Sequence, residues 1–474
     1  MQVAVLFFLT NPRDYDILKS KKRGDRVKSL RIEIPKDVRT LIGELESAGF
    51  TAYIVGGSVR DAVMGKTPND YDICTSASPD EMKRVFQGRN VIETGLQHGT
   101  LTVVGDENHY EITTYRVDGD YCDHRHPQSV VFVDNIEEDL ARRDFTVNAM
   151  AYNEKTGLVD PFGGVRDIER KIIRCVGDPD KRFTEDALRV MRAVRFASVC
   201  GSTIEENTKK AMFLHKNLLK NVSEERKTAE FRKMLISANA DILLTYKEIF
   251  ATFIPEIIPS FGFDQKNRHH RYDVYEHSAH AVALAPQDLI VRLALFFHDV
   301  GKPRTFTVDE NETGHFYDHA KESAIMTETA MKRMKFDTAT LRLVEELVEF
   351  HGLAPTDSPK YARKLLNRLG ETQVKRLLTL ARCDVGAQAI YEERDSVFQR
   401  IDSLEKNIDD ALAKQQCFSV KNLAVNGNDL KSLGIREGKE IGRLLNLLLD
   451  AVLETPELNE KKALLRLAQH EKNE

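Results

Sequence analysis

The sequence predicts an α+β fold, in which a head built on a mixed sheet with helices is followed by an all-helical remainder. Three observations support this prediction. Short apolar runs separated by glycine and polar turn residues succeed one another from residue 53 to residue 133, a pattern typical of strands. From about residue 171 onward, the apolar residues recur at helical spacing instead. The length of 474 residues is too great for one core, so we expect three or four domains.

Composition limits the classes of function. Charged residues make up 30% of the chain and no apolar run is long enough to cross a bilayer, so we expect no membrane contact. The formal net charge of −5 excludes a uniformly basic RNA-coating protein, and any nucleic-acid contact must come from local clusters of Lys and Arg. Six scattered cysteines form no C-x-x-C pair, which favours a reducing, cytoplasmic setting.

The first 30 residues differ in character from the rest of the chain. Val3–Leu9 is apolar, but no basic segment precedes it and no small-residue cleavage site comes after it, so a signal peptide is not indicated. We predict that residues 1–30 form a disordered or loosely attached extension. A buried extra strand is the alternative.

Residues 31–170 are predicted to form the head. Val38–Ala48 has helical periodicity and leads into a short apolar strand, Tyr53–Val55. One more helix and four more strands are expected at Pro79–Phe86, Val91–Glu93, Thr100–Val104, Tyr110–Tyr115 and Val130–Val133. Many strands with few helices indicate a mixed sheet with helices on one side.

The stretch after the strand at residues 53–55 predicts a phosphate cradle. Gly56–Gly57 is typical of a tight turn, and Ser58 stands where an N-cap belongs, opening a helix that stops at Gly65. The free amides at such a helix start bind phosphate groups.

Two acidic residues come after the cradle. Because side chains on a strand alternate, the carboxylates of Asp70 and Asp72 are expected to project from the same face. Two anions side by side repel unless a cation lies between them, and hard oxygen ligands suit Mg²⁺, which takes its other ligands from water and substrate phosphates. The arrangement predicts metal-assisted nucleotidyl transfer.

The glycine turn and the acidic pair, in this order, resemble the nucleotidyltransferases of the polymerase-beta superfamily, and within it the bacterial-type CCA-adding enzymes and poly(A) polymerases. The resemblance implies a polymerase-beta-like head in which Asp70 and Asp72 hold two Mg²⁺ ions. It also implies that the triphosphate is cradled by Gly56, Gly57, Ser58 and Arg60.

Two further stretches of the head resemble this family. An Arg pair beside Asp at a helix start is often only an ion-paired cap, yet Arg142–Ala149 also matches the family's RRD-F-T-[IV]-N-A motif. The match implies that Arg143 and Asp144 contact the ribose, with Asp144 near the metals. Asp160–Gly164 and Asp167 resemble the next motif, a glycine-rich hinge, and equally suit a plain turn.

Arg116–Pro127 lies between the last two predicted strands and has the composition of a surface loop. The resemblance implies a mobile loop associated with the final adenosine addition, which relatives that add only cytidines lack. Its presence favours an enzyme able to incorporate A.

Residues 171–236 are predicted to form a helical neck. Phe183–Phe196 has the pattern of one helix with Thr184 as its N-cap, and it places Asp186 one turn from Arg189. Asp186 and Arg189 either form a surface ion pair or recognise the base of the incoming nucleotide. Cytosine and adenine each present an amino donor beside a ring-nitrogen acceptor, which a carboxylate and a guanidinium match, whereas guanine and uracil reverse that order. The stretch matches the family's E-D-x-x-R-x-x-R motif, to which base selection is attributed. Arg192 and Arg195 extend the same face of the helix, and they either contact the triphosphate as part of the nucleotide site or pack against the head.

Residues 237–390 are predicted to be helical and to hold a second metal site. The order of one His, then His-Asp, then a distant Asp resembles the HD-type metal phosphohydrolases, whose ligands suit a divalent transition metal. The ligands that this resemblance implies are His277, His298, Asp299 and Asp384, and a second metal would take His319 and His351. In some relatives this region is a phosphatase or a 2′,3′-cyclic phosphodiesterase, and in others it is a scaffold.

Residues 391–474 are predicted to form a helical, RNA-binding tail. The segment is a run of amphipathic helices without a catalytic cluster, and it resembles the region with which the family holds the stem of the tRNA. Residues of this tail that can contact phosphates are Lys421, Lys431, Arg436, Lys439 and Arg443.

Together these patterns predict a CCA-adding enzyme with an HD domain, acting on tRNA with CTP and ATP. An A-adding enzyme or poly(A) polymerase is the nearest alternative. A metal phosphohydrolase whose head only holds RNA is a second, and a non-catalytic RNA-binding protein is a third, which the intact pair of aspartates opposes.

Overall fold

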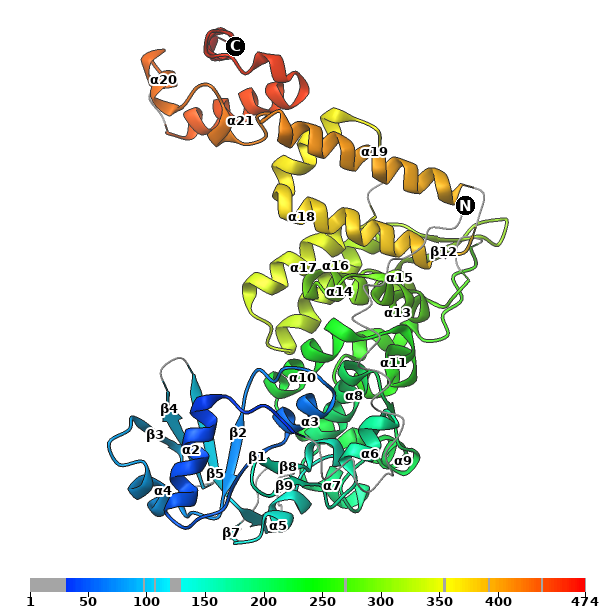
Figure 1. The fold of residues 1–474 in the computed structure, drawn as a ribbon. Coiled ribbons are helices and arrows are strands. Elements are labelled where there is room, and N and C mark those ends of the chain that lie inside the picture. The colour runs from blue at the N-terminus through cyan, green and yellow to red at the C-terminus, as the bar shows by residue number, and fades with distance from the viewer. Residues whose placement is uncertain are drawn as a thin grey trace, which may run out of the picture. The chain divides into compact units, whose positions relative to one another are not determined.

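The computed structural model describes residues 31–96, 99–105, 108–119, 129–267, 271–352, 355–390, 393–435 and 438–473. The predicted extension 1–30, most of the predicted loop 116–127 and Arg436 lie outside these ranges. The chain divides into two compact units between Glu230 and Phe231 (Figure 1). Within the described residues, no helix has the length and apolarity that crossing a bilayer requires.

The first unit is built on a seven-stranded mixed sheet with the order β3-β4-β5-β2-β1-β8-β9. Its strands are β1 (Ala52–Val55), β2 (Asp72–Thr75), β3 (Val91–Gly95), β4 (Thr100–Val104), β5 (His109–Thr114), β8 (Ala151–Asn153) and β9 (Gly157–Val159). β2 lies inside the sheet, antiparallel to β1 and parallel to β5. Strand pairing on both sides therefore fixes the position of β2, whose first residue is Asp72.

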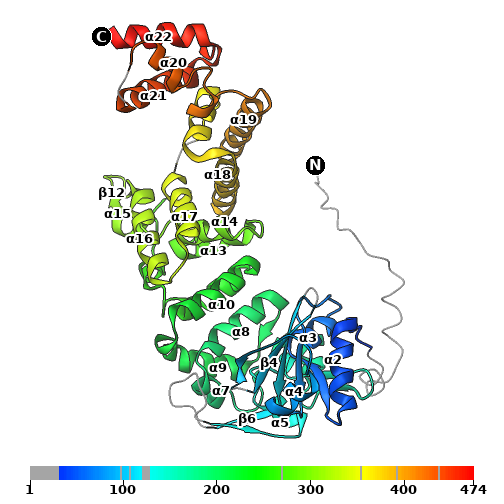
Figure 2. The same cartoon turned by 90° about the vertical axis from the view of Figure 1, so that its left-hand side faces the viewer.

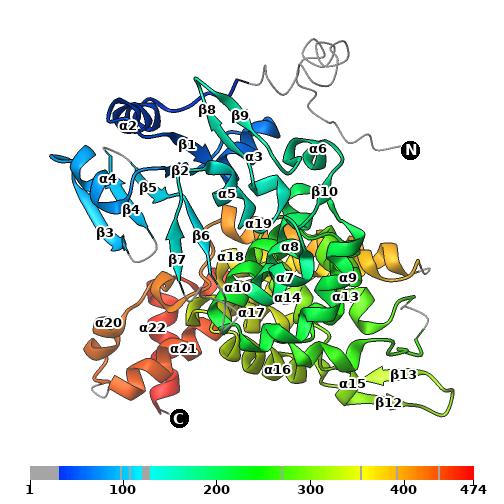
Figure 3. The same cartoon turned by 90° about the horizontal axis from the view of Figure 1, so that it is seen from below.

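Helices cover both faces of this sheet. α2 (Lys36–Ser47) and α4 (Pro79–Val85) lie on one side and α5 (Ile136–Ala141) on the other (Figure 3). Along β1, Ile54 packs with the α2 side while Tyr53 and Val55 pack with the α5 side. All four residues of β1 are buried for this reason. The expectation of helices on one side only was wrong, because the six-residue helix α5 packs Ile136 and Leu140 against the other face.

The other predicted elements of the head are present, and several short elements that were not predicted accompany them. β6 (Arg116–Asp118) and β7 (Val130–Phe132) pair as a separate two-stranded ribbon. Two more strands, β8 and β9, were not predicted, since each has only three residues. The segment that leads to the neck contains the short elements η4 (Thr146–Asn148), α6 (Gly164–Glu169) and β10 (Ile172–Ile173).

The neck departs from the predicted single helix. It is broken into α7 (Pro179–Glu185) and α8 (Leu188–Cys200) at Asp186, whose φ of −136° and ψ of 103° are extended. The carboxylate of Asp186 accepts the backbone N–H of Leu188 at 3.1 Å, and this local bond competes with the helical ladder. Thr184 lies in the last turn of α7, and Asp178 is the cap residue. The remaining elements are β11 (Thr203–Ile204), α9 (Glu206–His215), η5 (Lys216–Asn221) and α10 (Glu224–Ser237).

The second unit is almost entirely helical (Figure 2). Its first helices pack around α14, in which every residue from Val291 to Phe297 is buried. A hairpin of two short strands departs from the all-helical expectation, because Phe306 and Phe316 pair across it. α18 and α19 lie side by side, and the last elements enclose a separate apolar core around Leu444 and Leu448. The elements of this unit are α11 (Ala240–Thr245), α12 (Lys247–Phe250), η6 (Pro255–Ser260), α13 (Val274–Leu284), α14 (Leu289–Phe297), α15 (Lys302–Thr305), β12 (Phe306–Val308), β13 (Gly314–Phe316), α16 (His319–Arg333), α17 (Thr338–Phe350), α18 (Pro359–Ala387), α19 (Arg394–Ala413), η7 (Val420–Asn422), α20 (Gly427–Ser432), α21 (Gly438–Glu454), η8 (Pro456–Leu458) and α22 (Lys461–Asn473).

Candidate active site and a second polar cluster

The first unit contains a polar pocket of about 410 Å³. Its wall comes from four segments: the turn after β1, the start of β2, the segment after α5, and the neck. The side chains carry more positive than negative charge, which suits an anionic ligand. The lining residues are Gly56, Gly57, Arg60, Asp72, Arg142, Arg143, Asp144, Asn148, Asp186, Arg189, Arg192, Arg195 and Phe196.

The glycine turn requires its first glycine. Gly56 has a φ of 73°, and a Cβ atom there would lie 2.9 Å from Nη1 of Arg143. At Gly57 the nearest atom to such a Cβ is 3.7 Å away, an ordinary contact. The predicted cap was wrong: Gly56 is the N-cap of α3 (Gly57–Val63), while Ser58 is buried and its hydroxyl donates to the carbonyl of Val55.

The two predicted catalytic aspartates differ in their positions. Asp72 opens β2 and lines the pocket, whereas Asp70 precedes the strand and lines neither pocket of the head. The alternation of strand side chains therefore does not apply to the pair. Their carboxylates are nevertheless close enough to interact, because the charge of Asp70 contributes to a raised pKa of Asp72.

A third acidic residue, Glu111 on β5, was not predicted. Asp72 and Glu111 share a second pocket of about 150 Å³ that adjoins the first. Burial, together with the charges of Glu111 and Asp70, raises the pKa of Asp72 against the opposing charge of Arg143. The available signal was an isolated carboxylate in the otherwise apolar and hydroxylated strand His109–Thr114. The charges of Glu111 and Asp70 therefore both act on Asp72, and carboxylate oxygens of this kind suit a hard divalent cation.

Arg143 and Asp144 have different hydrogen-bond partners. Asp144 accepts from Nε of Arg192 at 2.7 Å and from the side chain of Asn148 at 3.2 Å. Burial opposes ionisation, yet Arg192 and Arg189 lower the pKa of Asp144 to about 2. Asn148 also accepts from Arg60 at 2.8 Å and thereby joins the glycine turn to the neck.

A fully buried carboxylate, Asp139 on α5, holds the arginine pair. It accepts from Arg142 at 2.7 Å and from Arg143 at 3.4 Å. Burial disfavours its charge, but the two guanidinium groups lower the pKa of Asp139. No pattern along the chain separates this residue from the other acids of α5, so its role was not predicted.

The two predicted base-reading residues ion-pair with different partners. Asp186 accepts from Arg226 at 3.0 Å, and Arg189 donates to Glu185 at 2.5 Å. Both line the pocket. The next predicted arginines are also engaged: Arg192 with Asp144, and Arg195 with Glu230 and with the ring of Phe196, whose centroid is 3.9 Å from Cζ.

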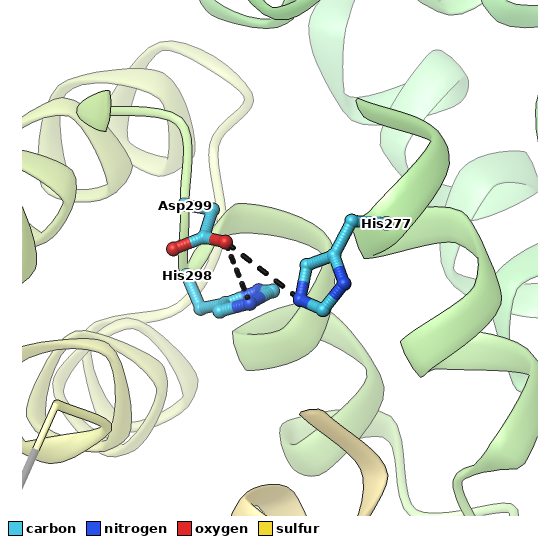
Figure 4. A group of neighbouring side chains, drawn as sticks. All are labelled: His277, His298 and Asp299. Carbon is cyan, nitrogen blue, oxygen red and sulfur yellow. Dashed lines mark ion pairs between the residues drawn. The ribbon is translucent and has the colours of Figure 1, made fainter. Parts of the chain in front are cut away.

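The second unit brings six predicted ligands together from α13, α16 and α18 and from the turns after α14 and α17. Figure 4 shows three of them, His277, His298 and Asp299. Asp299 lies between two pairs of imidazoles. Its Oδ2 is 3.2 Å from Nε2 of His298 and 3.8 Å from Nε2 of His277. Its Oδ1 is 3.5 Å from Nε2 of His319 and 3.6 Å from Nε2 of His351. Asp384 completes the cluster, 2.8 Å from His277.

The chemistry of this cluster fits a divalent metal. Nε2 of His298 is buried, and its 3.2 Å contact with Oδ2 of Asp299 does not have the geometry of a hydrogen bond, so a metal ion would satisfy this atom. Burial alone would disfavour the imidazolium, but Asp299 and Asp384 raise the pKa of His298 to about 10. The buried ammonium of Lys302 lies 2.7 Å from Asp299 and supplies a further positive charge.

The basic residues proposed for the tail form no comparable cluster in the described part of the chain. Lys421, Lys431 and Lys439 are exposed, and Arg443 pairs with Glu440 at 2.8 Å. Exposed pairs of this kind contribute little to stability.

Comparison with protein families finds three consecutive matches. Residues 52–174 match the Poly A polymerase head domain, residues 201–260 match the "Probable RNA and SrmB- binding site of polymerase A", and residues 316–468 match a tRNA nucleotidyltransferase domain 2. The HD pattern is not among these matches.

Individual proteins extend this likeness. The chain is 34% identical to the CCA-adding enzyme of Levilactobacillus brevis over 427 residues, which are 90% of this chain and 96% of the relative. A more identical alignment, 51% over 195 residues with the CCA-adding enzyme of Geobacillus thermodenitrificans, spans about half of that relative (48%) and 41% of this chain. The CCA-adding enzyme of Bacillus stearothermophilus, solved in complex with CTP, superposes with a TM-score of 0.69 at 29% identity, covering 92% of this chain and 96% of that one. The Thermotoga maritima enzyme, solved with a tRNA, shares the fold with a TM-score of 0.56 at 20% identity, covering 94% of this chain and 98% of that one.

Proposed function

Because the chain belongs to the family of CCA-adding enzymes, we propose that it adds C, C and A to the 3′ end of tRNA, using CTP and ATP and releasing pyrophosphate. One observation carries this proposal: a single pocket collects the glycine turn, Asp72, Arg143, Asp186 and Arg189 from segments that are far apart in sequence. A tRNA substrate and five free cysteines among the described residues support a cytoplasmic location.

The pocket binds the triphosphate and the smaller adjoining pocket receives the RNA end. Arg60, Arg192 and Arg195 surround the first pocket with guanidinium groups that can donate to phosphate oxygens. Thr113 and Arg116 line the second pocket, which is suited to a ribose and its phosphate. Asp72 borders both pockets, so the α-phosphate and the attacking 3′-hydroxyl meet beside its carboxylate.

Asp70, Asp72 and Glu111 would hold Mg²⁺ at this point. When bound, the ion supplies positive charge that favours ionisation of the attacking hydroxyl and stabilises the leaving pyrophosphate. The contributions of the chain itself are to align the hydroxyl with the α-phosphate and to neutralise the remaining phosphate charge through the arginines.

Asp186 and Arg189 choose the base. A carboxylate that accepts from the exocyclic amine and a guanidinium that donates to the ring nitrogen fit both cytosine and adenine. Uracil and guanine present the opposite order and would leave a carboxylate facing a carbonyl oxygen. One pair of residues can therefore select both CTP and ATP and discriminate against UTP and GTP.

Incorporation assays test this proposal. Transcripts that lack CCA, or that end after C, CC or CCA, are incubated with each of the four nucleoside triphosphates, and products are separated at single-nucleotide resolution. We expect addition of C to the first two ends, addition of A to the CC end, and no extension of a completed CCA end. Addition of A alone to the CC end would identify an A-adding enzyme instead, and long A tracts would identify a poly(A) polymerase.

We propose a second activity for the second unit, metal-dependent hydrolysis of phosphate esters such as 2′,3′-cyclic phosphates. The six-residue cluster around Asp299 favours it, because imidazole and carboxylate ligands suit a divalent transition metal. His277, His298 and Asp384 would hold one ion, His319 and His351 a second, and Asp299 would be shared. If the whole protein were only a hydrolase, Asp70→Ala would leave every activity intact. In our proposal this variant loses transfer while hydrolysis survives.

A further inference from the structure

The second pocket of the head contains a pair of hydroxyl groups beside its acidic residues. Thr100 on β4 and Thr113 on β5 lie opposite each other in the strand register, and their side-chain oxygens are 2.9 Å apart. Both threonines line the pocket of about 150 Å³, and both are partly exposed. Among the described residues, neither hydroxyl forms another hydrogen bond, so the pair has polar capacity left for a ligand.

The hydroxyl pair and the carboxylates lie on the same face of the sheet. On β5, Ile112 packs into the core on the α2 side, so Glu111 and Thr113 project from the opposite face, toward the pocket. β5 runs parallel to β2, and the partner of Ile112 is Ile73, the residue that follows Asp72. The floor of the pocket therefore carries carboxylates first and hydroxyls about 7 Å further along the strands.

The chemistry of this pair fits a ribose hydroxyl. A threonine hydroxyl has one donor and two lone pairs, so the bond between Thr100 and Thr113 leaves them one donor and three lone pairs. The 2′-hydroxyl of a ribose is also both donor and acceptor, and it is the group that distinguishes RNA from DNA. It is attached to the carbon next to the one that carries the 3′-hydroxyl, which in the proposed reaction lies beside Asp72.

We propose that Thr100 and Thr113 bind the 2′-hydroxyl of the acceptor's terminal ribose and thereby make the enzyme specific for an RNA end. This inference rests on the proposed function, in which the second pocket receives that end. The base at the end of the acceptor changes as nucleotides are added, whereas the terminal ribose is the same in every round. A contact with the ribose therefore serves all three additions.

Single-turnover incorporation of C by the full-length protein tests the inference. Two acceptors of the same sequence are compared, one ending in a ribose and the other in a 2′-deoxyribose. Thr113→Val replaces the hydroxyl with a methyl group, and it should reduce the efficiency of incorporation on the ribose end by about threefold to tenfold, the range of one neutral hydrogen bond. On the deoxyribose end, the same variant should stay within about twofold of the unaltered protein, because the contact is already missing there. Thr100→Val should behave in the same way, and Thr113→Ser should retain the preference for ribose.

Thr51→Val is the matched control. The hydroxyl of Thr51, just before β1, forms a comparable pair with the hydroxyl of Tyr115 at 3.1 Å, and neither residue lines either pocket of the head. This variant should leave the preference for the ribose end unchanged. A cross-strand pair of threonines can also stabilise a sheet, and a purely structural role would lower incorporation equally on both ends. Equal losses would overturn the inference.

Failure of the inference and failure of the proposed function give different results. If the unaltered protein adds C and both valine variants keep its preference for ribose, the proposed function stands and the threonines do not bind the 2′-hydroxyl. If the unaltered protein adds no nucleotide to either end, the proposed function itself is wrong and the inference falls with it. Should one valine variant not fold, the other decides, because each removes one of the two hydroxyls.

Discussion

Replacing Gly56 by alanine should destabilise the first unit by about 2 kcal/mol. A φ of 73° costs an L-residue roughly 1–2 kcal/mol, and the new Cβ would lie 2.9 Å from Nη1 of Arg143, which must then move. Gly57 provides a matched control, because its φ is not positive and a Cβ there meets nothing closer than 3.7 Å. Alanine at this helical position should be neutral or slightly stabilising.

Thermal unfolding monitored by calorimetry measures this difference. The transition of the first unit is the one that added CTP raises, and for a unit of this size about 2 kcal/mol corresponds to a decrease of roughly 4–8 °C in Tm. We also expect Gly56→Ala to raise the KM for CTP, because Arg143 is displaced from the pocket. The reasoning is refuted if Gly57→Ala lowers the Tm as much as Gly56→Ala does, or if neither variant changes it.

The two sites lead to three further predictions. Asp72→Asn should reduce incorporation of every nucleotide by about a thousandfold while leaving hydrolysis of a 2′,3′-cyclic phosphate unchanged, and parallel assays of the two activities would contradict us if both fell together. His298→Ala should remove bound divalent metal, measured by elemental analysis after dialysis, and abolish hydrolysis; a full complement of retained metal would rule out the ligand assignment. Asp144→Asn should lower the free energy of unfolding by about 2 kcal/mol at pH 7, because the pKa of Asp144 in the folded protein, about 2, lies below its ordinary value of 3.8. A carboxyl whose pKa is lowered by folding stabilises the folded state fully only above its pKa in the unfolded chain. Urea unfolding of both proteins should therefore show the difference in their free energies of unfolding shrinking between about pH 4 and pH 2, and a difference that stays constant would exclude this linkage.

Local patterns predicted most of the head well. The helix at residues 38–48 and the strands at residues 53–55, 100–104 and 110–115 appear within two residues of their expected bounds, because each combines clear periodicity with turn residues at its ends. α14 lies within residues 237–390, which were predicted to be helical, and it consists of the apolar run between Asp288 and His298. Short elements such as β6, β8 and β9 lack a long enough pattern and became visible only through their partner strands.

The site was predictable in its residue types and less so in its contacts. The motifs brought Asp72, Arg143 and Arg189 into one pocket as expected, and the alternation argument failed for Asp70 because the strand begins after it. Glu111 and Asp139 were missed, since neither the acid in the strand nor the acids of α5 carry a local signal of their partners. Their roles depend on pairings between elements distant in sequence, which spacing along one segment does not encode.

The interior position of β2 has a consequence for repeated synthesis. Pairing with β1 and β5 ties down the strand that begins at Asp72, so this acid cannot move relative to the rest of the sheet without breaking strand pairs. After each round it is the acceptor strand that must withdraw by one nucleotide. In the proposed reaction, Asp72 therefore keeps its place in the head while the product strand moves past it.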